Sequence, residues 1–297
     1  MTDRAAYALV LHGGAGPTPG RDYSEVETHL GRLIDQGQAL LDRGRSALDV
    51  VEEMVAGMEA SGLYVAGRGS APNASGIVEM DASIMDGASH RAGGVAAVRD
   101  LAHPVRAARA VMERTPNVLL AGEGADLFCR EVGLELTAGR ADWYRLPVGV
   151  EAAETRQDEL AHGTVGAVAL DQDGHLAAAT STGGLFGKRA GRVGDTPLIG
   201  SGSWADGQVA VSCTGLGEYF MLGKTAYDVS ARMRYGGACV TEAGRAALDT
   251  IAARGGDGGL IAVDSQGRIA MPYNSLGMKR AWVRAGEPAR VAVFGEG

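Results

Sequence analysis

Two threonines in the second half of the chain have the chemistry of a nucleophilic centre. Thr164 follows Gly163, and Thr182 stands at the far end of a segment that predicts two short strands. A threonine hydroxyl is a weak nucleophile until a nearby base removes its proton. No histidine or lysine stands at a spacing that indicates such a base.

A cut between Gly163 and Thr164 would supply the missing base. Thr164 would gain a free α-amino group with a reference pKa of about 7.7 to 8.0, so roughly a tenth of it is unprotonated at neutral pH. Glycine at position 163 fits this cut, because it tolerates the twisted backbone that exposes its carbonyl to the Thr164 hydroxyl. The alternative is that Gly163 and Thr164 simply begin a strand, since threonine favours strands.

The segment around these threonines predicts a β-hairpin. Asp171-Gln172-Asp173-Gly174 is a turn signal between two apolar runs. A two-residue turn there places residue 164 opposite residue 181 or residue 183, depending on which pair forms its centre. Either register leaves Thr182 one step from the partner of Thr164, within reach of its side chain.

The elements that must position this hairpin form groups of strands beside groups of helices. Such grouping favours a layered α+β architecture over a doubly wound parallel sheet. A polar, mostly acidic stretch over residues 140–163 predicts an exposed linker. The predicted strands are 7–11, 76–86, 93–98, 165–170, 176–181, 209–214, 260–264 and 268–271, and the predicted helices cover 24–61, 104–113, 123–132, 218–233 and 241–253.

The composition is that of a globular protein and argues against several functions. The chain has 297 residues, of which 45% are hydrophobic and 22% charged. A net charge of −8 without a Lys/Arg cluster argues against nucleic-acid binding. The apolar run near the N-terminus, 7–11, is too short for a signal peptide or a membrane span, which predicts a cytoplasmic protein without a membrane partner. Three cysteines lacking metal-ligand spacing argue against a disulfide framework or a zinc site.

A series of motifs gives the chain a specific resemblance to a known family. It resembles the plant-type asparaginase and isoaspartyl peptidase branch of the N-terminal nucleophile hydrolases over nearly its whole length. This resemblance implies a four-layer αββα sandwich, with two antiparallel sheets between helical layers, formed by residues 1–297 as a single domain. In chain order the motifs are HGGAG, MDASIMDG, HGTVGAVALD, ATSTGG, GRVGDTPLIGSG, SCTGLGE and MKRAW.

The resemblance implies that the chain is an inactive precursor that cleaves itself into residues 1–163 and 164–297. Thr164 then becomes both nucleophile and base, and Thr182 forms a hydrogen bond with its hydroxyl. The predicted hairpin, which brings Thr182 within reach of the Thr164 side chain, agrees with this role.

Substrate-binding roles are also implied by the resemblance. Arg192 would bind the α-carboxylate of the substrate and Asp195 its α-ammonium, a division that suits a planar guanidinium and a carboxylate. Thr214 and Gly215 would form the oxyanion hole, and Gly217 would help to line the amino-group pocket. The alternatives are a loop salt bridge between Arg192 and Asp195, and a helix cap at Thr214.

The activity that follows is hydrolysis of L-asparagine to aspartate and ammonia, or of isoaspartyl (β-aspartyl) dipeptides, by a dimer of αβ heterodimers.

No cofactor is required, although in this family the loop from Glu59 to Gly69 can hold a structural sodium ion through main-chain carbonyls. His12 is architectural in the family, and Val65 replaces its usual asparagine, which affects the rate or the preferred leaving group. The alternatives are a glycosylasparaginase, a threonine protease of the same superfamily, or an unprocessed, non-catalytic binding protein with this fold.

Overall fold

The computed structural model describes residues 7–137, 142–151 and 163–295. The strands within these ranges are β1 (Ala8–Ala15), β2 (Met80–Asp86), β3 (Arg91–Val98), β4 (Leu119–Ala121), β5 (Thr164–Leu170), β6 (Leu176–Thr182), β7 (Ser203–Ala205), β8 (Val209–Gly215), β9 (Gly258–Asp264), β10 (Ile269–Ala270), β11 (Met278–Arg284) and β12 (Arg290–Ala292). The helices are α1 (Ser24–Asp42), α2 (Ala47–Ser61), α3 (Pro104–Arg114), α4 (Gly122–Glu131), α5 (Gly217–Gly223), α6 (Thr225–Gly236) and α7 (Val240–Ala252), with a 3₁₀ turn, η1, at Gly67–Gly69.

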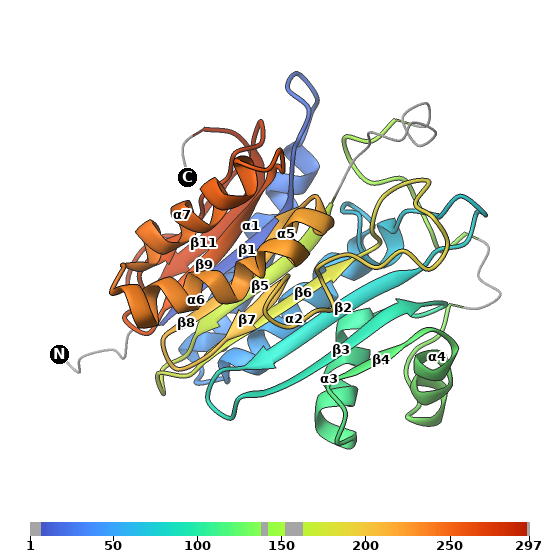
Figure 1. Ribbon diagram of the computed structural model, residues 1–297, viewed down its shortest axis with the longest axis horizontal. Coiled ribbons are helices and arrows are strands. Elements are labelled where there is room, and N and C mark those ends of the chain that lie inside the picture. The colour runs from blue at the N-terminus through green and yellow to red at the C-terminus, as the bar shows by residue number, and fades with distance from the viewer. Residues whose placement is uncertain (1–6, 138–141, 152–162, 296–297) are drawn as a thin grey trace.

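These elements form two β-sheets packed face to face between layers of helices. In the described residues, the larger sheet has eight strands in the order β12-β11-β1-β5-β6-β2-β3-β4, and the smaller has four in the order β10-β9-β8-β7. Helices α1, α2 and α3 pack on the larger sheet, and α6 and α7 pack on the smaller one (Figure 1). The predicted four-layer sandwich is confirmed.

One edge of the larger sheet departs from the prediction of two antiparallel sheets. Strand β4 runs parallel to β3. The reason lies in the connection, because α3 crosses over between the two strands and returns the chain in the direction of β3. The larger sheet is therefore mixed, while the smaller one is antiparallel throughout the described residues.

Apolar side chains fill the spaces between the four layers by alternating along the strands. In β1, Leu9 and Leu11 face the helices α1 and α2, whereas Ala8 and Val10 face the smaller sheet. A third apolar cluster joins the smaller sheet to α6 and α7. All four β1 side chains are fully buried, so this strand lies at the centre of the core.

Several predicted helices have different limits in the structure. The predicted helix 24–61 is two helices, with Gly44 in a left-handed conformation (φ 75°) between them. The second begins after Ser46, whose side chain accepts a hydrogen bond of 3.2 Å from Asp49 N and so caps the helix. The predicted helix 218–233 is divided at Lys224, whose φ of 50° interrupts the helical backbone. None of the helices in the described ranges combines the length and apolarity needed to cross a bilayer.

The β5–β6 hairpin has a register that the sequence did not predict. Thr164 pairs directly with Thr182, so both predicted registers are wrong by one residue. Asp171 N donates to His175 O at 3.0 Å, which leaves residues 172–174 as a three-residue turn. Asp171 Oδ1 holds this turn by accepting hydrogen bonds from Asp173 N (3.0 Å) and His175 N (2.9 Å). Asp171 Oδ2 also accepts one from Ala47 N at 2.8 Å, which ties this loop to the start of α2.

The predicted linker 140–163 lies partly outside the described residues. Within it, residues 142–151 contact the loop that follows α2: Arg145 N donates to Arg68 O (3.0 Å), and Val148 N donates to Leu63 O (3.2 Å). Gly163 is buried. This part of the chain therefore packs against the protein close to the predicted cleavage point.

Candidate active site

The two threonines meet at the open end of the β5–β6 hairpin. The Thr164 hydroxyl donates to Thr182 Oγ1 at 3.3 Å, and the Thr182 hydroxyl donates to the carbonyl oxygen of Gly163 at 3.1 Å. Gly184 N also donates to Thr182 Oγ1, at 2.9 Å. Because a hydroxyl has a single proton, that of Thr182 is used on the Gly163 carbonyl, the group that the Thr164 hydroxyl would attack.

A narrow pocket opens beside these hydroxyls and contains most of the predicted substrate-binding residues. Arg192 lines it from the loop after β6, and Glu218, which is not among the lining residues, holds its guanidinium. This contact is bidentate, with Nε to Oε1 at 2.9 Å and Nη2 to Oε2 at 2.8 Å. The residues lining the pocket are Thr164, Thr182, Gly184, Leu185, Arg192, Gly194, Asp195, Thr196, Gly215 and Gly217.

Asp195 is a buried carboxyl group in this pocket. Burial raises its pKa to about 7, an effect that Arg192 partly opposes. Asp195 Oδ2 has no hydrogen-bond partner among the described residues. A β-carbon on Gly217 would lie 2.9 Å from Asp195 Oδ1 and 3.1 Å from Arg192 Nη2, so only glycine fits between the two charged groups. The site can therefore accept a cationic group beside Asp195.

Thr214 and Gly215 end strand β8, and Gly215 lines the same pocket as Thr164. Thr214 Oγ1 accepts a hydrogen bond from Ala15 N at 3.2 Å, which leaves its own proton available for donation. Cys213 N donates to Gly202 O, on the side of β7. Because N–H groups alternate along a strand, Gly215 N–H points to the same side, beyond the end of β7. Both donors are suited to a developing negative charge on oxygen.

A buried polar chain holds the backbone of Thr164 in place. His12 Nδ1 lies 3.1 Å from Thr164 O. Because a carbonyl oxygen can only accept, Nδ1 carries the ring proton and donates it. Nε2 therefore accepts from the Ser212 hydroxyl, at 2.8 Å. Burial lowers the pKa of His12 to about 3, which keeps the ring neutral. Ser212 in turn contacts Thr180 Oγ1 at 2.8 Å. The chain thus connects β1, β5, β6 and β8 directly behind the nucleophile.

Comparison with known proteins assigns the chain to a family. The family model described as asparaginase matches residues 5–293. The chain belongs to the asparaginase family. An isoaspartyl peptidase of Salmonella typhimurium is 43% identical over 308 residues, covering 97% of this chain and 98% of the relative. The plant-type L-asparaginase of Pyrobaculum calidifontis is 42% identical, with 94% and 97% covered, and the isoaspartyl peptidase/L-asparaginase of Danio rerio is 41% identical, with 94% and 93% covered.

Sequence reasoning missed three charged residues around the site of this asparaginase-family protein. Lys188 is buried and donates to Gly183 O at 2.9 Å and to Glu79 O, and burial lowers its pKa. Asp81 is buried opposite Thr182 in the sheet and accepts from Ala97 N at 2.8 Å. Glu218 orients Arg192. Asp81 and Glu218 lie within the family motifs, whereas Lys188 carries no sequence signal beyond its position in a glycine-rich loop.

Val65 lies against the residue whose carbonyl would be attacked. A β-carbon on Gly163 would come within 2.6 Å of Val65 Cγ2, and Val65 packs in turn with Ala71 and Phe186. Its carbonyl accepts from Gly183 N at 2.8 Å. The departure from the asparagine typical of the asparaginase family thus places an apolar wall beside Gly163.

Replacement of His12 tests whether its ring is neutral in the folded protein. An unfolded histidine takes up a proton below about pH 6.5, whereas folded His12 stays neutral down to about pH 3, so folding loses stability as the pH falls through this window. Between pH 7 and pH 5 this loss amounts to about 2 kcal/mol. We expect His12→Asn or His12→Gln to reduce this loss in the free energy of unfolding by about 2 kcal/mol. The measurement is urea unfolding, with each change made in Thr164→Ala protein so that the chain stays uncleaved. The exposed His90→Asn is the control, and an equal pH-dependent loss in all variants would contradict the assignment.

Proposed function

We propose that the protein is a self-processing threonine amidohydrolase that acts on L-asparagine and on isoaspartyl dipeptides. The observation that carries this proposal is the position of the Thr182 hydroxyl, which contacts both the Thr164 hydroxyl and the Gly163 carbonyl. Relatives named isoaspartyl peptidase and plant-type L-asparaginase, at 42 to 43% identity, support the substrate class.

Self-cleavage would proceed through an ester. Thr164 Oγ1 attacks the carbonyl carbon of Gly163, and the Thr182 hydroxyl stabilises the charge that develops on the carbonyl oxygen. The bond between Gly163 and Thr164 N then breaks, and the nitrogen takes up a proton to become the free amine. Water hydrolyses the ester, which yields one chain ending at Gly163 and one beginning at Thr164.

Turnover would reuse the same hydroxyl, with the new amine as its base. The amine accepts the proton of Thr164 Oγ1 as this oxygen attacks the side-chain amide of the substrate. Thr214 and Gly215 donate to the resulting oxyanion, each donor contributing about 3 kcal/mol to lowering the barrier. The leaving amine, ammonia or an amino acid, takes the proton, and water then releases L-aspartate from the ester.

Substrate orientation would come from Arg192 and Asp195. Glu218 binds the edge of the Arg192 guanidinium that is formed by Nε and one N–H of Nη2. The other edge, formed by Nη1 and the second N–H of Nη2, is left for the α-carboxylate of the substrate. Asp195 would receive the α-ammonium next to Gly217. Arg192 and Asp195 together would select substrates that have a free α-carboxylate and a free α-ammonium group. With these two groups bound, the side-chain amide of the substrate would lie at Thr164.

A sodium ion held by the loop from Glu59 to Gly69 is part of this proposal. Main-chain oxygens of Glu59, Gly62 and Tyr64 crowd the positions where β-carbons on Gly67 and Gly69 would stand. Carbonyl oxygens are hard donors that suit such a cation. The ion would fix this loop, including Val65, with no part in the chemical steps.

Assembly and location also stay proposals. We infer a dimer of αβ heterodimers and a cytoplasmic location from the family membership.

The first test is a denaturing gel of purified protein. We expect two bands of roughly 17 and 14 kDa, by proportion of chain length, because Thr164 cleaves the chain at its own amide. Thr164→Ala should give a single band of about 30 kDa, because it lacks the hydroxyl. A wild-type chain that stays intact after prolonged incubation would instead support a non-catalytic binding protein.

A second test uses the raised pKa of Asp195, which is about 7 because the carboxyl is buried. Below this pH the free enzyme carries a neutral Asp195, which binds the substrate ammonium poorly, and the Thr164 amine is also protonated. We therefore expect log kcat/KM for β-Asp-Leu to fall with a slope of about two below pH 7 in wild type and about one in Asp195→Asn. A slope that is unchanged in Asp195→Asn would refute the ammonium-binding role.

A further inference from the structure

The connection between α7 and β9 is the most glycine-rich part of the described chain next to the site. It reads Gly-Gly-Asp-Gly-Gly over residues 255–259. Glycine loses more conformational freedom on folding than any other residue, so this connection needs contacts that fix it. Gly258 has a φ of 151°, which few other residues adopt.

This connection lies directly against the predicted oxyanion hole. Gly258 pairs with Gly215 in the β8–β9 ladder, and Leu216 N donates to Asp257 O at 3.2 Å. A β-carbon on Gly215 would collide with Asp257 O, and one on Gly258 would collide with Thr214 O. With the two backbones in such close contact, a shift of residues 257–258 moves Gly215 as well.

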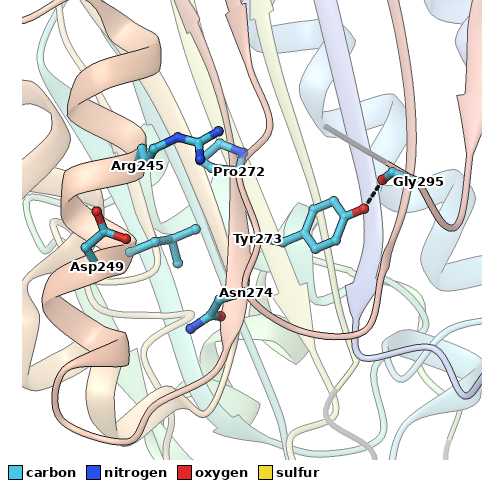
Figure 2. A pocket seen from close by; sticks show the side chains of 7 residues that line it. Arg245, Asp249, Pro272, Tyr273, Asn274 and Gly295 are labelled. Carbon is cyan, nitrogen blue, oxygen red and sulfur yellow. Dashed lines mark hydrogen bonds between the residues drawn. The ribbon is translucent and has the colours of Figure 1, made fainter.

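The side chain of Asn274 fixes this connection on both sides of Asp257. Asn274 Oδ1 accepts from Gly258 N at 2.8 Å, and Nδ2 donates to Gly256 O at 3.1 Å. Its backbone N–H also donates to Gly258 O at 3.0 Å. Asn274 lines a cavity of about 590 Å³. Figure 2 shows Arg245 and Asp249 extending from α7 on the other side of this cavity.

We infer that Asn274 is a positioning residue for the oxyanion hole, acting through Gly258 on Gly215. This inference rests on the proposed function, since it concerns the same Gly215 N–H. The Asn274 amide holds the two peptide groups that flank Asp257, and Asp257 and Gly258 hold the backbone on either side of Gly215. The Gly215 N–H thereby keeps a fixed direction while charge develops on the substrate oxygen.

The test measures kcat and KM for β-Asp-Leu in Asn274→Ala and Asn274→Asp, normalised to the cleaved fraction, together with inhibition by L-aspartate. An oxyanion contact acts in the transition state alone, so kcat should fall about tenfold in Asn274→Ala while KM and the L-aspartate Ki stay within about twofold. Asn274→Asp keeps the size and the acceptor for Gly258 N but loses the donor to Gly256 O, so its kcat should also fall. It supplies the test if the alanine variant does not fold.

Arg245→Ala is the matched control, because Arg245 lines the same cavity and, within the described residues, forms no hydrogen bond with residues 256–258. Its kcat should equal that of wild type. A kcat within twofold of wild type in both Asn274 variants, or a parallel rise in KM and in the L-aspartate Ki, would overturn the inference. Thr214→Ala separates the two proposals. If it lowers kcat and the Asn274 variants do not, the positioning role alone fails, and if neither it nor the Asn274 variants lower kcat, the oxyanion hole fails and the inference with it.

Discussion

The single proton of the Thr182 hydroxyl is the interaction on which the site depends. It is donated to the carbonyl oxygen of Gly163, while the Thr182 oxygen accepts from Thr164 and from Gly184 N. A hairpin shifted by one residue would turn the Thr182 side chain to the opposite face of the sheet and remove its contacts with Thr164 and Gly163. The three-residue turn at Asp171 sets that register, so a polar contact at one end of the hairpin determines the chemistry at the other.

The sandwich gives this contact a rigid and dry environment. Apolar layers fill most of the space between the sheets, but behind Thr164 the layer is polar, from His12 through Ser212 to Thr180. Buried polar groups cost several kcal/mol unless they are paired, so this chain must keep its partners, and it fixes the positions of four strands relative to one another. Donors held in this way need no reorganisation when charge develops, which is the condition for strong transition-state stabilisation.

The motifs and the strand pattern predicted the layered fold and the residues that line the pocket, but several features depend on contacts between distant residues. The register was missed because the Asp171 side chain takes part in the turn. Strand β11 was missed because Lys279 and Arg280 break its apolar pattern. Both are buried, and their cations lie 5.3 Å from the Tyr23 ring centroid and 5.2 Å from that of Tyr273. The orientation of Arg192 by Glu218 is likewise a contact between residues that are distant in the chain, so the motifs alone did not reveal it.

N-terminal sequencing of the smaller chain from active enzyme would identify the residue at which the protein is cut. We expect a fragment that begins Thr-Val-Gly-Ala, because the hydroxyl and the new amine must belong to the same residue for Thr164 to act as both nucleophile and base. Active enzyme that contains no chain beginning at Thr164 would rule out this role for Thr164.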